Sequence, residues 1–370
     1  MAGIYIHIPF CKQRCRYCAF YSSTLYNIKE SYVNALCKEL VMRKDYTDGE
    51  TIETIYLGGG TPSTLSIEQL KKICDTIYAT YTVSSTPEVT IECNPDDLTP
   101  DFLALLKRLP FNRISMGVQS FDDGILKFMN RRHDADTARK AYEILEASGV
   151  ENISLDLIFG LPQLSDQQWQ ETLDKALSIS PSGKLPKHIS SYQLSVEPGS
   201  MLAKMVQKGM WSEASDELCE RQYRILCETL AQAGYHHYEI SNFAHPGYEA
   251  VHNSAYWRHV PYVGLGPGAH SFVCGNLRMW NKPDLKGYIA DPCGIQEHEV
   301  LDDEQLVLEK VMLALRTSEG ISEKYLYEHC DNPAVKRAFA AGDLEHTASG
   351  NVRIPENRFF VSDSIISEIV

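Results

Sequence analysis

Six short apolar segments recur along the first half of the chain, and each is followed by a stretch with the period of an amphipathic helix. Most of these segments are nearly uninterrupted apolar runs, which is typical of parallel strands buried on both faces. Alternation of strands and helices predicts βα units with right-handed crossovers. We therefore expect parallel strands at Ile4–Ile8, Thr54–Leu57, Val89–Glu92, Ile114–Val118, Ser154–Ile158 and His188–Leu194.

Six units fall short of the eight that close a TIM barrel. The pattern therefore predicts an α/β fold whose core, residues 1–240, is a partial, open (β/α)6 barrel of TIM type. Residues 235–244 are expected to add an edge strand to this core. The helices expected are Lys29–Tyr46, Ser66–Tyr81, Thr99–Leu109, Ala135–Ser148, Asp166–Ser178 and Ser215–Ala233.

The chain changes character after the core. Residues 241–300 are expected to form a connecting region, because much of this stretch is rich in glycine, proline, histidine and aromatic residues and has no regular period. Within it, Gly264–His270 is expected to be a loop near the mouth of the barrel. Residues 301–370 begin with a helical pattern at 302–316 and end with a hairpin pattern at 351–362. They predict a small C-terminal α+β module resembling a winged helix.

The composition excludes several classes of protein. The net charge is −14, and no cluster of lysine and arginine is dense enough for a nucleic-acid partner. No apolar run approaches the roughly 18 residues that a membrane span needs. The first residues lack the cationic start and long apolar run of a signal peptide. We therefore expect a cytoplasmic protein with no membrane span.

Three of the eleven cysteines lie within eight residues, directly after the first expected strand. Cys11, Cys15 and Cys18 have the spacing C-x3-C-x2-C. Thiolates are suited to iron–sulfur clusters, and three of them on one loop can bind three irons of a [4Fe–4S] cluster. The fourth iron would remain open to the amino and carboxylate groups of S-adenosylmethionine (SAM). A zinc site is the alternative, although zinc usually takes four protein ligands and no nearby His or Cys completes the set.

Glycine and polar residues follow the later strands. Gly58–Thr61 ends the second strand in G-G-G-T, which allows backbone to approach a ligand closely. Glu92, Gln119 and Asp156 lie at the next three strand ends or within them, and Arg131 follows the fourth strand. Such residues also serve as turns, helix caps and ion pairs. Together, however, they fall where a barrel places its active site.

The cysteine motif and the preceding Tyr5–Cys11 segment, YIHIPFC, resemble the radical SAM superfamily and, within it, the anaerobic coproporphyrinogen dehydrogenase group. The resemblance covers residues 4 to about 290. It implies a [4Fe–4S] cluster on Cys11, Cys15 and Cys18 and an electron donor such as flavodoxin or ferredoxin. The residues it implies for SAM, some of them in a second SAM site, are Tyr5, Tyr17, Gly59, Gly60, Thr61, Glu92, Gln119, Arg131 and Asp156.

Two features depart from the dehydrogenases. Phe20 stands where they carry a fourth cysteine, and the cluster motif begins at residue 11, which leaves no room for their N-terminal extension. A second motif, His252-Asn253-x-x-Tyr256-Trp257, resembles the signature of the HemW-type haem chaperone subgroup. The resemblance implies haem bound by these four residues, with His252 as an axial ligand of the iron and the aromatic rings against the macrocycle.

The H-N-x-x-Y-W residues have a plainer interpretation, in which they pack the junction between the barrel and the C-terminal module. His7 and His270 are further haem-ligand candidates, each with a structural alternative. The leading functional hypothesis is a chaperone that passes haem to an acceptor protein of unknown identity. The alternative is an oxygen-independent coproporphyrinogen III dehydrogenase, and a third is radical SAM chemistry on another substrate.

Overall fold

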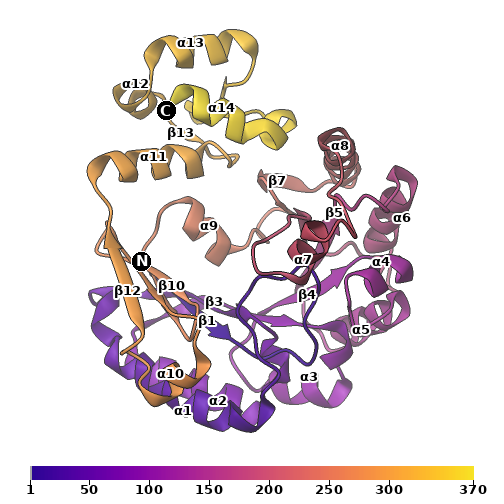
Figure 1. Ribbon diagram of the computed structural model, residues 1–370, viewed down its shortest axis with the longest axis vertical. Helices are drawn as coiled ribbons and strands as arrows, with labels where there is room; N and C mark the ends of the chain where they lie inside the picture. Colours follow the sequence, from indigo (N-terminus) through magenta and orange to yellow (C-terminus); the bar gives the residue numbers. More distant parts are fainter. Residues whose placement is uncertain (1) are drawn as a thin grey trace.

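A continuous sheet forms the body of the protein, and the computed structural model describes it within residues 2–370 (Figure 1). In these residues the sheet has twelve strands in the order β12-β11-β10-β9-β1-β2-β3-β4-β5-β6-β8-β7. The expected parallel strands are present in chain order as β1 Ala2–Ile8, β2 Ile52–Gly59, β3 Val83–Cys93, β4 Arg113–Gln119, β5 Asn152–Phe159 and β6 His188–Gln193. The prediction of an open, parallel α/β barrel is confirmed.

Helices cover the outside of this sheet (Figure 1), and all of them except α1 (Lys29–Met42) begin at a side-chain cap. Ser66 and Ser165 each form a capping box with the glutamine three residues on, which satisfies backbone N–H groups that a helix start leaves free. These helices are α1 Lys29–Met42, α2 Ile67–Thr80, α3 Pro100–Leu106, α4 Asp123–Phe128, α5 Ala135–Ala147, α6 Asp166–Leu177 and α8 Asp216–Gln232. A further helix, α7 Met201–Gln207, lies against the segment after β1, where the Leu202 N–H donates to the Arg16 carbonyl.

Alternation along the strands separates an apolar outer face from a polar inner one. In β2, Ile55 and Leu57 are buried in the hydrophobic core beneath the helices. Thr54, Tyr56 and Gly58 lie on the other face and meet polar side chains from neighbouring strands and from the segment that closes the barrel. The inside of this barrel is therefore a polar site rather than an apolar core.

The region expected to be an irregular connection contains several short strands and two helices. A hairpin of β7 His236–Glu239 and β8 Asn242–Ala244 joins β6, which extends the edge strand expected there. The segment expected to be a loop from Gly264 is instead strand in its first two residues, because β9 Tyr262–Leu265 runs parallel to β1. The other elements here are α9 Val251–Trp257, β10 His270–Val273, β11 Leu277–Asn281, α10 Leu285–Ala290 and β12 Gln296–Val300.

Gly264 lowers the strand propensity of β9, but the packing of this strand requires a glycine. A Cβ on Gly264 would lie 1.8 Å from the carbonyl oxygen of His270, so the approach of β9 to β10 requires glycine. A buried ion pair on α1 then holds the region in place. Arg43 donates to the Gly264 carbonyl at 3.2 Å, and Glu39 accepts from the Gly266 N–H at 2.8 Å. These long-range bonds have no periodic signal in the sequence.

A smaller module follows the barrel and lies at the top of Figure 1. It contains α11 Asp303–Ala314, β13 Ile321–Ser322, α12 Glu323–His329, α13 Asn332–Ala341, β14 Glu345–His346, β15 Asn351–Arg353 and α14 Ser362–Ile369. The expected helix is confirmed, and β13, β15 and β14 form a small antiparallel sheet. The hairpin expected at 351–362 was misplaced: it pairs β14 with β15, and residues 356–369 are helical because Phe359, Ile365 and Ile369 turn inward.

The domain limits at residues 240 and 300, and the likeness of the module to a winged helix, stay predictions. The order helix, strand, two helices and hairpin is the one that a winged helix would have. Within residues 2–370, no helix is long and apolar enough to cross a membrane.

Candidate functional site

The three clustered cysteines lie on one loop that leaves the carboxyl end of β1. All three side chains are partly exposed and carry no disulfide. The loop is tied down by backbone, since the N–H of Cys11 donates to the Ser23 carbonyl at 3.1 Å. The hydroxyl of Thr61 donates to the sulfur of Cys11 at 3.5 Å, and the guanidinium of Arg131 donates to the sulfur of Cys15 at 3.3 Å. Each polar neighbour would stabilise a thiolate.

A buried carboxylate holds the same loop from below. Asp97 accepts from Lys12 at 2.6 Å, from Arg132 at 3.2 Å and from the hydroxyl of Ser63 at 2.9 Å. Although burial raises the pKa of Asp97, the contacts with Lys12 and Arg132 hold that pKa below its ordinary value. An ionised Asp97 therefore joins the cysteine loop to the segment after β2. Asp97 is not predictable from the sequence, because no local pattern reveals a contact across 85 residues.

The chemistry of the three thiols suits an iron–sulfur cluster. Among residues 2–370, no three His, Cys, Asp or Glu side chains converge as the ligands of one metal ion would. A cubane makes a different demand, because each thiolate binds its own iron. Burial raises the pKa of Cys18 to about 11 and also raises the pKa of Cys11. Binding of iron would therefore release protons from these thiols.

The glycines after β2 pass close to the end of β1. Gly59 has φ of 96°, and a Cβ there would lie 2.3 Å from the ring of His7. A Cβ on Gly60 would lie 2.5 Å from the carbonyl oxygen of Ile8. Both positions therefore require glycine. The same crowding brings backbone N–H and C=O groups to the edge of the cysteine loop, where a ligand could meet them.

Glu92 lies next to this glycine segment, at the end of β3. One carboxylate oxygen accepts from the Gly59 N–H at 3.1 Å, and the other accepts from the hydroxyl of Tyr56 at 2.8 Å. Burial, with a contribution from nearby Asp156, raises the pKa of Glu92 to about 7. A carboxylate held in this way can accept hydrogen bonds from a ribose or an ammonium group. Tyr56 was not among the residues predicted for the site. Its position two residues after Thr54 places both side chains on the same face of β2.

The remaining expected residues lie around the same ends of the strands. Gln119 has φ of 67°, a strained value for a residue other than glycine. Arg131 donates to the Gly117 carbonyl and to Asn94, both at 2.7 Å, and its Nε is buried without a partner within the described residues. Asp156 accepts from Ser115 at 2.9 Å, and burial raises its pKa to about 6.

Two aromatic residues complete this group. Tyr5 lies on the inner face of β1, where its hydroxyl is 3.2 Å from Nδ1 of His7 and its ring stacks on Tyr56. Burial raises the pKa of Tyr17, whose immediate neighbours are Cys15 and Arg131. The structure thus gathers every residue predicted for SAM around the carboxyl ends of β1 to β5. Their roles in binding SAM stay predictions.

The four residues predicted for haem lie elsewhere, on α9 near the amino end of β1 (Figure 1). His252 is 3% exposed. Its Nδ1 is 2.7 Å from the hydroxyl of Thr54, and its Nε2 is 2.8 Å from the hydroxyl of Tyr256. Asn253 donates weakly to Glu239 at 3.4 Å, and the Nε1 of Trp257 is buried with no partner in residues 2–370. Both nitrogens of His252 are therefore engaged in this arrangement.

The other two histidine candidates differ from each other. The Nε2 of His7 is 2.7 Å from the Tyr21 carbonyl, and the ring is buried beside Gly59. His270 is exposed and stacks on Trp280. His7 therefore supports the cysteine loop, whereas His270 lies on the surface of the sheet extension.

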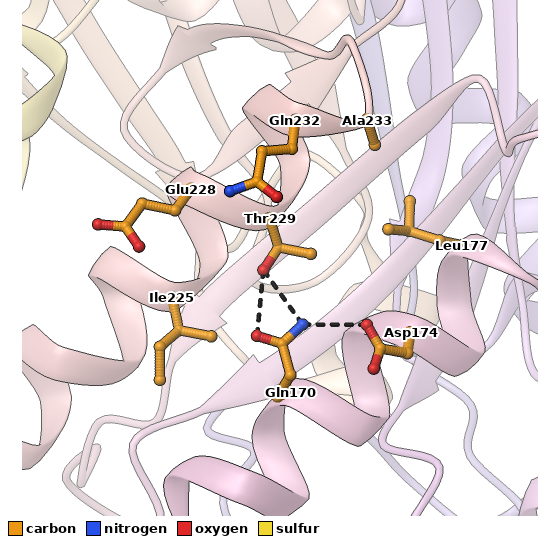
Figure 2. A pocket seen from close by; sticks show the side chains of 8 residues that line it. All are labelled: Gln170, Asp174, Leu177, Ile225, Glu228, Thr229, Gln232 and Ala233. Atoms are coloured by element: carbon orange, nitrogen blue, oxygen red, sulfur yellow. Dashed lines mark hydrogen bonds between the residues drawn. The ribbon is translucent and has the colours of Figure 1, made fainter.

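Two surface hollows have quite different surroundings. One, of about 600 Å³, lies between α6 and α8, where Gln170 bonds to Thr229 and Asp174 (Figure 2). Its lining contains none of the residues predicted for the site. The other, of about 270 Å³, is lined in part by Lys127 and Arg131 and therefore borders the cysteine loop.

The fold and this site define a radical SAM protein. The model of the radical SAM superfamily matches residues 5–176. A solved structure of coproporphyrinogen III oxidase (HemN) from Escherichia coli, a radical SAM enzyme, superposes with a TM-score of 0.81. It covers 99% of this chain and 89% of that one at 20% identity, which shows a shared fold. Membership of this superfamily implies a [4Fe–4S] cluster and SAM as cofactors.

Within the superfamily, the chain belongs to the HemW family. It is 36% identical over 365 residues to the heme chaperone HemW of Bacillus subtilis (strain 168), covering 95% of this chain and 94% of the relative. It is 37% identical to the heme chaperone HemW of Synechocystis sp. PCC 6803, covering 86% and 78%. The expected relationship to this subgroup is confirmed.

Proposed function

We propose that this protein is a haem chaperone on a radical SAM scaffold, which binds one [4Fe–4S] cluster, SAM and haem and passes haem to an acceptor protein. The observation that carries the proposal is the 36% identity, over almost the whole of both chains, to a relative named as a heme chaperone. Phe20, at the position of a fourth cysteine, supports it against the dehydrogenase reaction. We place the protein in the cytoplasm.

Cys11, Cys15 and Cys18 would hold the cluster, and Gly59, Gly60 and Glu92 would hold SAM. The bound cluster supplies an electron that can cleave SAM to a 5′-deoxyadenosyl radical. The residues of the chain would bind and orient SAM and would neutralise charge on the cysteine thiolates. Thr61 and Arg131 donate toward the cysteine sulfurs. Gly117 and Gln119 line the neighbouring strand end, with Tyr5, Tyr17 and Asp156 completing the polar wall.

Haem is proposed to contact the H-N-x-x-Y-W segment. Burial and nearby Arg113 lower the pKa of His252 to about 3, so its imidazole is neutral, as an iron ligand must be. The Nε2 of His252 is the ring nitrogen that faces another residue of the motif, Tyr256. Iron bound at Nε2 would therefore replace the hydrogen bond between His252 and Tyr256. Thr54 would meanwhile retain Nδ1 and fix the ring, as second-shell partners do. Trp257 adds apolar area and an N–H that has no partner among residues 2–370.

The electron donor is proposed to be a small acidic redox protein such as flavodoxin or ferredoxin. Arg14 and Arg16 lie on the cysteine loop, and Lys127 is on the adjoining α4. The two segments touch, since Asn130 donates to the Arg14 carbonyl and Arg16 lies over the ring of Phe128. Within the described residues, Arg14 and Lys127 form no ion pair. This is a basic surface beside the cluster in a chain of net charge −14.

One anaerobic experiment tests the function. Reconstituted protein is loaded with haem and mixed with an apo-haemoprotein, and transfer is followed by the Soret band of the acceptor. Transfer that accelerates with the chaperone present supports the proposal. A parallel reaction contains SAM, reductant and coproporphyrinogen III instead. Multiple turnovers to protoporphyrinogen there, without haem transfer, would establish the dehydrogenase.

A further inference from the structure

The buried histidine of the H-N-x-x-Y-W motif closes the amino end of the barrel. The backbone N–H groups of Val251 and His252 donate to the carboxylate of Glu88 on β3 at 3.0 and 2.9 Å. A Cβ on Gly3 would lie 3.4 Å from the imidazole, so β1 passes directly beside the ring. The imidazole is thus fixed by its own backbone, by β1 and by the hydroxyl of Thr54.

One face of this ring stacks on Tyr56. The centroids of His252 and Tyr56 are 5.1 Å apart, with 21° between their planes, and Tyr56 in turn stacks on Tyr5 at 6.1 Å. The Tyr56 ring therefore contacts two other rings inside the barrel. Rings in offset stacks restrict one another, so the position of the Tyr56 hydroxyl depends on both neighbours.

That hydroxyl reaches the next layer of the barrel. It donates to one oxygen of Glu92, and the other oxygen accepts from Gly59 in the glycine segment. Thr54, Tyr56 and Gly58 are successive residues on the inner face of β2. The contacts of His252 and Glu92 with this face therefore follow one another from the start of the strand to its end. His252 lies at the bottom of this series, and Glu92 and Gly59 lie at the top.

From these contacts we infer that His252 is a positioning residue for the SAM site. Thr54 and Tyr56 transmit its position to Glu92 and Gly59. The inference rests on the proposed roles of Glu92 and Gly59 toward SAM, and it is independent of whether His252 also binds iron. Its ring face and Nδ1 serve the SAM site, whereas Nε2 is the atom left for haem. The H-N-x-x-Y-W motif therefore acts on both ligands.

The test changes the neighbours of His252 and leaves every possible iron ligand in place. Thr54→Val removes the hydroxyl that holds Nδ1, Thr54→Ser retains it, and Tyr56→Phe removes only the hydroxyl that reaches Glu92. SAM affinity of the reconstituted protein is measured by calorimetry, and the EPR spectrum of the reduced cluster is recorded with SAM. Thr229→Val on α8 is the matched control, since it makes the same change far from the barrel interior.

We expect SAM affinity to fall about tenfold in Thr54→Val and in Tyr56→Phe, as for a lost buried hydrogen bond. The Thr54→Ser variant should recover the SAM affinity. The double variant Thr54→Val/Tyr56→Phe should lose less SAM binding energy than the sum of the losses in the two single variants. The EPR change on adding SAM should weaken in the same variants. SAM affinities within twofold of wild type in both Thr54→Val and Tyr56→Phe would overturn the inference. A wild type that binds SAM normally but transfers no haem would instead overturn the proposed function alone.

Discussion

A guanidinium nitrogen of Arg131 lies 3.3 Å from the sulfur of Cys15. The other terminal nitrogen of Arg131 donates to the Gly117 carbonyl, so the charge is fixed by β4 rather than free to move. A fixed cation beside one sulfur ligand favours the reduced cluster, which carries one more negative charge.

Arg131→Met should therefore make the midpoint potential of the cluster more negative, by on the order of tens of millivolts. An anaerobic redox titration followed by EPR measures the change. Arg139→Met is the control, because Arg139 pairs with Asp136 and Glu143 on the exposed face of α5. Equal potentials in the Arg131 variant and wild type would show that this contact has no electrostatic effect on the cluster.

Cluster assembly should depend on three thiols and no others. We expect about four irons and four sulfides per reconstituted chain. Single changes of Cys11, Cys15 or Cys18 to alanine should abolish the cluster, whereas Cys37→Ala should retain it, since Cys37 lies on α1 beside Thr76. Iron and sulfide analysis with the visible spectrum measures the outcome. A complete cluster in any of the three variants would contradict the assignment.

SAM binding should strengthen as pH rises from about 6 to 8. Burial raises the pKa of Glu92 to about 7, so its carboxylate becomes available as an acceptor only across this range. The sign for folding is opposite: a carboxyl whose pKa is raised in the folded state contributes stability at low pH, and that contribution is lost as pH rises through about 7. Titration of SAM at several pH values measures the first effect. Glu92→Gln should bind SAM weakly and without this dependence on pH.

Haem binding should weaken in His252→Ala and shift its Soret band, because a neutral buried imidazole is lost. His329→Ala serves as the matched control, since His329 is exposed on α12 and is no candidate ligand. Hemin titrations of both variants and wild type measure affinity and spectrum together. If His252→Ala binds with an unaltered spectrum and affinity, haem has another ligand or none.

Reduction by an acidic protein donor should depend on the basic surface beside the cluster. Arg14→Glu combined with Lys127→Glu should slow reduction by flavodoxin on the order of tenfold at low salt, and less at high salt. Reduction by dithionite should be unchanged. Lys324→Glu combined with Arg337→Glu, on the exposed faces of α12 and α13, is the charge-matched control. Equal slowing of the dithionite reaction would mean that the cluster itself is damaged.

The strands of the barrel were predictable because burial on both faces leaves continuous apolar runs, as at Ile4–Ile8. The cysteine loop was predictable from spacing alone. β9 was not, since a four-residue strand containing Gly264 carries no periodic signal and is held by Glu39 and Arg43 from α1. The placement of His252 beneath Tyr56 was equally hidden, because it depends on how a distant helix closes the barrel.

β1 is paired on one side with β2 and on the other with β9. During synthesis, β1 therefore remains without one of its two neighbours until Tyr262–Leu265 has been made. Such long-range pairing slows folding, and it leaves an apolar strand and three thiols exposed in the growing chain. We therefore expect insertion of iron and sulfide to follow synthesis of β9, which completes the pairing of the strand that leads into the cysteine loop.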